Sequence, residues 1–156
     1  IDQVDQKIIV KEVGQGMGRE SLKALFSLPI EAIDFAANGG TNFAKLEMNR
    51  ASEEIRDHYR KIANLGHSAK EMVDMSNEVI AELGNRCLCK QVIVSGGVKD
   101  FLDGYYLTEK MNVPAIYGQA SAFLKHAKES YEQLQEYTEA QISGLRLANA
   151  FLKVKE

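Results

Sequence analysis

The chain has few residues of the kinds that mark extracellular, membrane or nucleic-acid-binding proteins. Its 156 residues include two cysteines and no tryptophan, and 19 Lys and Arg against 22 Asp and Glu give a formal net charge of −3. A chain without a basic excess is not expected to bind nucleic acid. No apolar run approaches the roughly 20 residues that span a membrane, and no charged-then-apolar leader opens the chain. The composition predicts a soluble, cytoplasmic protein that binds neither nucleic acid nor membrane.

The cysteines form one Cys-x-Cys pair, Cys87 and Cys89. No further cysteine completes a metal site of the usual kind. Buried thiols at the start of a strand are therefore our interpretation, in preference to a redox or zinc role. The chain begins with Ile1 rather than Met, which suggests a processed or truncated product.

The length is that of one ordinary domain with a hydrophobic core, and it falls well short of the roughly 250 residues of a complete TIM barrel. Neither a linker nor a low-complexity tract divides the sequence, so residues 1–156 are predicted to form a single domain.

Four short apolar runs, each followed by glycine and by a helical pattern, predict strands at 7–13, 32–37, 91–95 and 115–118. The expected helices begin at residue 19, after the capping box of Ser68 with Glu71, and at caps formed by Asp100, Ser121 and Ser130.

The alternation of strands and helices predicts an α/β fold with a parallel sheet and right-handed crossovers. A longer excursion at 49–65 separates the second and third strands. Four βα units correspond to half of a barrel, which leaves two sheet edges and an inner apolar face open to water. We therefore expect aggregation, self-association, or pairing with a missing amino-terminal half.

Glycines at the ends of the last two strands predict a phosphate site. In barrel enzymes the loops after late strands hold phosphates, because glycine lets backbone amides approach the anion and a helix amino terminus favours it. A tight turn without a ligand is the alternative interpretation. The residues of this predicted site are Ser95, Gly96, Gly97, Gly118, Gln119 and Ala120.

Two further side chains at strand ends are candidates for ligand binding. Lys11 lies at the top of the first predicted strand, where its ammonium needs an anionic or electron-rich partner unless it reaches solvent. Thr41 follows a pair of glycines, and its hydroxyl is suited to bind a ligand. The histidines, His58, His67 and His126, are scattered without metal-ligand spacing, and none is assigned a role.

Several strings occur in a fixed order along nearly the whole chain. They are Lys-Glu-Val-Gly at 11–14, Ala-Ile-Asp at 32–34, Gly-Gly-Thr-Asn-Phe-Ala at 39–44 with Glu47 and Arg50, and Ser-Gly-Gly at 95–97 with Asp103. The first and third are specific together, whereas Ser-Gly-Gly is shared by many FMN barrels. Taken together, the strings resemble the family of type 2 isopentenyl diphosphate isomerases.

The resemblance implies the carboxyl-terminal half, the last four βα units, of a TIM barrel that uses reduced FMN, Mg²⁺ and NADPH. Members interconvert isopentenyl diphosphate and dimethylallyl diphosphate without net redox change. The lysine matching Lys11 contacts the flavin ring near N1 and O2, and the threonine matching Thr41 contacts FMN. The glycines matching Gly96 and Gly97, and the stretch matching 118–120, hold the FMN phosphate.

The same resemblance places the Mg²⁺ ligands and the diphosphate contacts in the amino-terminal half. No catalytic or metal-binding residue is therefore assigned to this chain, and the chain alone is expected to be inactive. Family members tend to form tetramers or larger assemblies, so a homo-oligomer is expected.

Two other functions stay open. A 2-hydroxy acid oxidase is another FMN barrel, but it places a histidine base and an arginine in a late loop, and residues 38–42 contain neither. The second alternative is a non-catalytic, phosphate-binding half-barrel that dimerises through its open sheet edges.

Overall fold

The computed structural model describes residues 5–155, which form an α/β fold around one four-stranded parallel sheet. The strands pair in chain order, and β1 and β4 are its two edges. Their positions confirm the predicted runs. The strands are β1 (Ile9–Lys11), β2 (Ala32–Asp34), β3 (Val92–Ser95) and β4 (Ala115–Gly118).

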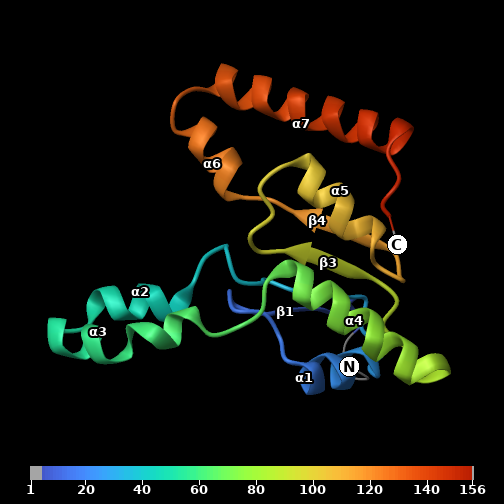
Figure 1. The fold of residues 1–156 in the computed structure, drawn as a ribbon, viewed down its shortest axis with the longest axis horizontal. Coiled ribbons are helices and arrows are strands. Elements are labelled where there is room, and N and C mark those ends of the chain that lie inside the picture. Colours follow the sequence, from blue (N-terminus) through green and yellow to red (C-terminus); the bar gives the residue numbers. More distant parts are fainter. Residues whose placement is uncertain (1–4, 156) are drawn as a thin grey trace.

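The helices follow the strands in the predicted alternation. They are α1 (Arg19–Phe26), α2 (Phe43–Arg50), α3 (Glu53–Tyr59), the 3₁₀ helices η1 (Arg60–Asn64) and η2 (Gly84–Arg86), α4 (Ala69–Leu83), α5 (Phe101–Glu109), α6 (Ser121–Ala127) and α7 (Tyr131–Phe151). Helices α1 and α4 lie side by side, α7 packs along α5, and α2 and α3 project as an arm (Figure 1). None of the helices within residues 5–155 has the length and apolar character needed to cross a membrane.

Side-chain caps start three of the helices where the sequence predicts them. Ser68 and Glu71 form the capping box of α4, with the Glu71 carboxylate accepting from the Ser68 amide at 2.7 Å. The Asp100 carboxylate accepts from the second and third amides of α5, and the Ser130 hydroxyl accepts from the third amide of α7. Each cap satisfies backbone donors that have no partner inside the helix, which fixes the point where the chain leaves a strand loop.

The two faces of the sheet differ. On one face Ile33, Val92 and Val94 are at most 1% exposed, because the helices cover them. On the other face the edge residues Ile9 and Ile116 are 53% and 64% exposed. The sheet therefore has one packed face and a second face whose edge strands expose apolar side chains.

The paired cysteines are buried, as predicted. Cys87 and Cys89 are 2% and 0% exposed, and their thiols donate to the carbonyls of Cys89 and Gln91. Burial raises the pKa of the Cys89 thiol above its ordinary value, since the thiolate would lose its hydration. Among the residues that the structure describes, no group of three or more His, Cys, Asp or Glu side chains is placed to hold a metal ion.

Candidate functional site

The loops that follow the four strands meet at the carboxyl edge of the sheet. A Cβ placed on Gly14 would lie 1.8 Å from the Thr41 carbonyl oxygen, so the loops after β1 and β2 are in direct contact. A Cβ on Gly39 would lie 2.7 Å from the Cα of Gly97, which brings the loop after β2 against the loop after β3. The carboxyl ends of parallel strands are where open α/β sheets and barrels bind ligands.

Asp34, at the end of β2, joins three strands at this edge. Its carboxylate forms an ion pair with the Lys11 ammonium from β1 and accepts a hydrogen bond from the Ser95 hydroxyl of β3. The Asp34 side chain is 11% exposed, whereas that of Lys11 is 58% exposed. The predicted anionic partner of Lys11 is therefore a residue of the chain itself. Sequence analysis did not select Asp34, because its partners become neighbours only through the sheet register.

The same carboxylate stabilises an unusual turn at the end of β2. Ala36 has a φ of +40°, in the left-handed region that residues with a side chain seldom adopt. Its amide donates to Asp34 at 3.3 Å and to the Ser95 hydroxyl oxygen at 3.1 Å. Backbone strain of this kind is found preferentially at functional sites, where surrounding contacts enforce it.

Glu12 organises the loop after β1. Its carboxylate accepts from the amides of Gly14, Gln15 and Gly16 at 2.6, 2.7 and 2.9 Å. Burial alone would raise the pKa of Glu12, but the backbone hydrogen bonds outweigh it and hold the pKa below the ordinary value of 4.5. The charged form of Glu12 therefore stabilises this loop.

Replacing Glu12 with Gln is expected to lower the free energy of unfolding at pH 7 by about 1–2 kcal/mol, because a neutral amide oxygen accepts these hydrogen bonds more weakly. Because the pKa of Glu12 is lower in the folded than in the unfolded chain, its charge stabilises the fold above pH 4.5. This stabilisation is lost as the pH falls through the pKa that Glu12 has in the folded chain. The deficit of the variant should therefore shrink below that pH. Urea unfolding from pH 7 to 3 measures it, with Glu136→Gln on the exposed surface of α7 as control. An equal deficit at every pH would contradict this role.

The loops after β3 and β4 lie next to each other, as the predicted phosphate site requires. Ser95 and Gly118 are register partners in the sheet. The Gly96 amide belongs to the ladder that pairs Ser95 with Gly118. Among the described residues, the amides of Gly97, Gln119 and Ala120 donate no backbone hydrogen bond outside the helices and strands. The Ser95 hydroxyl, in contrast, is engaged by Asp34 and Ala36.

The residues after β4 differ in part from the expectation. The Gln119 side-chain amide donates to the Lys99 carbonyl and, at 2.9 Å, to the Tyr137 hydroxyl, so it ties the loop after β4 to the loop after β3 and to α7. The predicted cap Ser121 is wrong: Ala120 occupies the cap position of α6, without a side-chain hydrogen bond. A hydroxyl one residue inside the helix is past the position from which it caps the first turn.

Thr41 lies on the exposed loop between β2 and α2. Its hydroxyl makes no hydrogen bond within the described part of the chain, whereas its neighbour Asn42 caps α2 by accepting from the Lys45 amide at 2.9 Å. The structure therefore places Thr41 at the rim of the site rather than in the network around Asp34. Glu47 and Arg50, which accompany the Gly-Gly-Thr-Asn-Phe-Ala string, form an exposed ion pair at 2.8 Å.

Several known proteins that resemble this chain in sequence carry the same name. No family model matches the chain. A protein of Ignicoccus hospitalis is 31% identical over 94% of this chain, one of Rickettsia felis 29% over 90%, and one of Staphylococcus epidermidis 30% over 83%. Each is named isopentenyl-diphosphate delta-isomerase. The chain spans 39%, 38% and 34% of their respective lengths, about two-fifths or less of the curated relatives it matches.

This finding corrects the sequence-based assignment to the carboxyl-terminal half of the type 2, FMN-dependent class. The names of the relatives give the isomerase activity without a class or a cofactor. The matched share of each relative does not establish which part of a particular enzyme class the chain represents. The comparisons support similarity to isopentenyl-diphosphate delta-isomerases and nothing narrower.

Proposed function

We propose that the chain is the cofactor-phosphate-binding part of an isomerase that interconverts isopentenyl diphosphate and dimethylallyl diphosphate. The observation that carries the proposal is the meeting of the loops after β3 and β4, where the amides of Gly97, Gln119 and Ala120 donate no backbone hydrogen bond to another described residue outside the helices and strands. The name shared by the relatives supplies the reaction. In that reaction one proton is added at the terminal alkene carbon and another leaves the allylic carbon, with no net redox change.

The proposed cofactor is FMN, whose phosphate would be held by these amides. Unpaired backbone N–H groups favour a phosphate, and the nearest buried carboxylate, Asp34, is already neutralised by Lys11. Reduced FMN, when bound, would supply the proton transfers of this isomerisation. The Lys11 ammonium, held by Asp34 yet more than half exposed, is proposed to donate a hydrogen bond to the electron-rich edge of the ligand. Thr41 contributes a free hydroxyl at the rim.

We further propose that the sheet is half of a βα barrel and that its open face is covered in the working protein. Ile9 and Ile116 on that face are exposed, and both edge strands have unpaired outer sides. The covering partner is either additional chain, corresponding to the part of the relatives that this chain does not span, or a second copy in a homo-oligomer. Solution mass distinguishes the two. The Mg²⁺ ligands and the residues that use NADPH to reduce the flavin are assigned to the covering part, so the chain alone does not turn over substrate.

A titration with FMN and with riboflavin, followed by flavin fluorescence, tests the phosphate site. Riboflavin lacks the phosphate, so FMN is expected to bind at least about tenfold more tightly, in line with a few charge-assisted hydrogen bonds. Ala120→Asp is expected to erase this difference, because its carboxylate occupies the free amides and repels the phosphate. The same change should raise stability by about 1 kcal/mol, since Asp is a better cap for α6 than Ala.

Ala120→Asn is the matched control, because it caps the helix without a charge and should retain part of the preference for FMN. Equal affinity of the unaltered chain for FMN and riboflavin would reject the phosphate site. The chain could prefer FMN and yet catalyse no isomerisation, even after the proposed covering part is added. That result would favour the non-catalytic phosphate-binding half-barrel.

A further inference from the structure

The arm formed by α2, α3 and η1 contains a cavity with an unusual charge distribution. Its volume is about 430 Å³, and it opens between the two helices and η1. No carboxylate belongs to its lining. The residues around it are Lys45, Met48, Asn49, Arg56, Arg60, Ala63 and Asn64.

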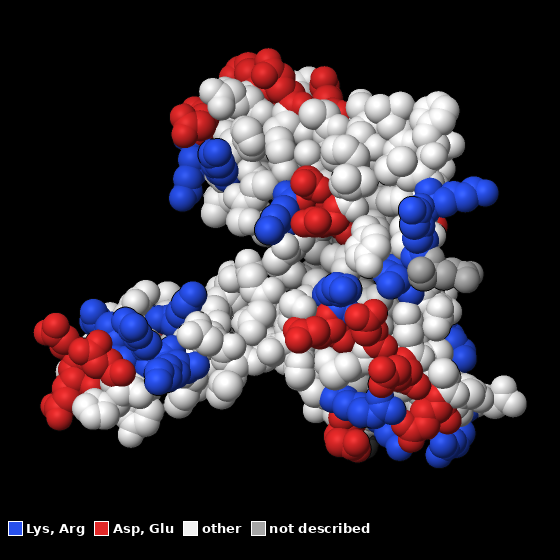
Figure 2. Space-filling model, viewed as in Figure 1, with Lys and Arg blue, Asp and Glu red and all other residues white. Residues whose placement is uncertain are grey.

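The positive charges of this cavity are not neutralised by the chain. Within residues 5–155, none of Lys45, Arg56 and Arg60 forms an ion pair. The segment 43–64 contains five basic and four acidic side chains, so the arm as a whole is nearly neutral. The cavity is cationic because three of the basic side chains line it and none of the acidic ones does. Glu47 is held by Arg50 outside the cavity. Lys and Arg gather in the middle of the arm, and Asp and Glu lie toward its outer end (Figure 2).

Backbone contacts hold the cavity in shape. The Arg56 guanidinium donates to the carbonyls of Met48 and Ala51, both at 3.3 Å, so it is fixed across the end of α2. The Asn42 side chain caps α2 and also donates to the Ala63 carbonyl at 2.6 Å, which ties the start of α2 to η1. The site is therefore held between three elements rather than formed by one mobile side chain.

The placement of like charges favours the binding of an anion in the cavity. Arg56 and Arg60 are four residues apart on consecutive turns, a spacing at which like charges repel. An anion between them removes this repulsion, and a planar guanidinium matches phosphate oxygens through paired hydrogen bonds. The amides of Asn49 and Asn64 add neutral donors at the same cavity.

We propose that the arm is a binding site for a diphosphate, with Lys45, Arg56 and Arg60 as its cationic ligands. Cations from two helices and η1 suit an anion with two phosphoryl groups better than a single small anion. The site is separate from the loops proposed to hold the FMN phosphate, and it does not depend on that proposal.

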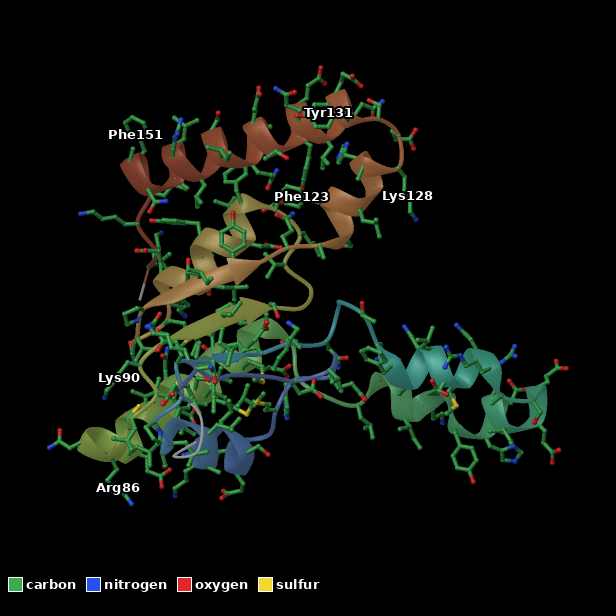
Figure 3. All side chains as sticks on the ribbon, turned by 180° about the vertical axis from the view of Figure 1, so that it is seen from behind. Arg86, Lys90, Phe123, Lys128, Tyr131 and Phe151 are labelled. Carbon is green, nitrogen blue, oxygen red and sulfur yellow. The ribbon has the colours of Figure 1, made fainter. Side chains whose placement is uncertain are left out.

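Calorimetric titration of the chain with inorganic diphosphate, without divalent cations, tests the site. Saturable binding is expected, and the double variant Arg56→Gln/Arg60→Gln should weaken it by about tenfold or more. The matched control is Arg86→Gln/Lys90→Gln, which removes the same charge at the end of the molecule opposite the arm (Figure 3) and should change the affinity less than twofold. Circular dichroism checks that both variants are folded.

Asn49→Asp is a second test that leaves the guanidinium contacts in place. It introduces a carboxylate of nearly the same shape into the cavity lining, and it should weaken diphosphate binding severalfold. Absence of saturable binding overturns the proposal. It is also overturned if both double variants weaken binding equally, because the effect would then come from the net charge of the chain. A third contrary result is an affinity that neither Arg56→Gln/Arg60→Gln nor Asn49→Asp changes.

The source of the diphosphate is distinguished by repeating the titration with isopentenyl diphosphate. Equal affinity for both ligands, with the same loss in the arm variants, supports a site that recognises the diphosphate alone. Tighter binding of isopentenyl diphosphate, again lost in the arm variants, supports the head group of a prenyl substrate as the natural ligand. An affinity for isopentenyl diphosphate that the arm variants leave unchanged counts against the arm as its site.

Discussion

Replacing Asp34 with Ala is expected to lower the free energy of unfolding by about 2–4 kcal/mol, among the largest effects of any single change in this chain. The carboxylate is nearly buried, and its removal leaves the Ser95 hydroxyl and the Ala36 amide with fewer acceptors. Lys11 contributes less to the loss, because its exposed ammonium regains water. Urea unfolding at pH 7 measures the change.

Asp34→Asn separates the hydrogen bonds from the charge. The amide oxygen still accepts from Ser95 and Ala36, so this variant should recover at least half of the stability lost in Asp34→Ala. Combining each variant with Lys11→Met gives a double-mutant cycle, in which the Lys11–Asp34 coupling is expected to be about 1 kcal/mol or less. A loss below about 1 kcal/mol in Asp34→Ala would show that the strands do not depend on this residue.

Replacing Gly96 with Ala is expected to destabilise the chain by about 3–5 kcal/mol. Gly96 has a φ of +90°, and a Cβ there would lie 2.1 Å from the Ala37 carbonyl oxygen and 2.4 Å from its amide nitrogen. Both atoms belong to the backbone of the neighbouring loop, so relief requires that the loops after β2 and β3 move apart. Thermal and urea unfolding measure the loss.

Gly18→Ala is the control for that change. Gly18 is also a loop glycine, but its φ is −75° and a Cβ would meet nothing within 4 Å. Its substitution should change stability by less than about 0.5 kcal/mol. Similar losses at the two positions would mean that contact between the loops is not what requires glycine at Gly96. The contrast also shows that this glycine is explained by loop packing, whether or not a phosphate binds beside it.

The features that sequence analysis predicted correctly depend on neighbouring residues in the chain. A serine followed three residues later by glutamate is enough to start α4 at Ser68, because both hydrogen bonds lie within one turn. The strands are short apolar runs that are each followed by glycine, and their order follows from the alternation with helices. Ser121 failed because the start of α6 is set by the turn out of β4, and a single hydroxyl does not override it.

The features that were missed depend on partners distant in sequence. Asp34 and Ser95 are 61 residues apart, and only the register of the parallel strands brings their side chains into contact. The cavity of the arm likewise requires the angle at which η1 folds back on α2, which no local pattern specifies. The sequence thus located the loops that follow the strands but not the carboxylate that joins three of those strands.

The order of strands in the sheet, β1-β2-β3-β4, is also the order in which a ribosome makes them. Each βα unit can therefore dock on the edge left by the unit before it, without waiting for a later strand to be inserted between two earlier ones. The one long delay falls between β2 and β3, while the arm and α4 are synthesised. Because the arm is held by contacts within 42–64, it can form during that interval and leave the β2 edge free for β3. Assembly during translation is expected to proceed in one direction along the sheet.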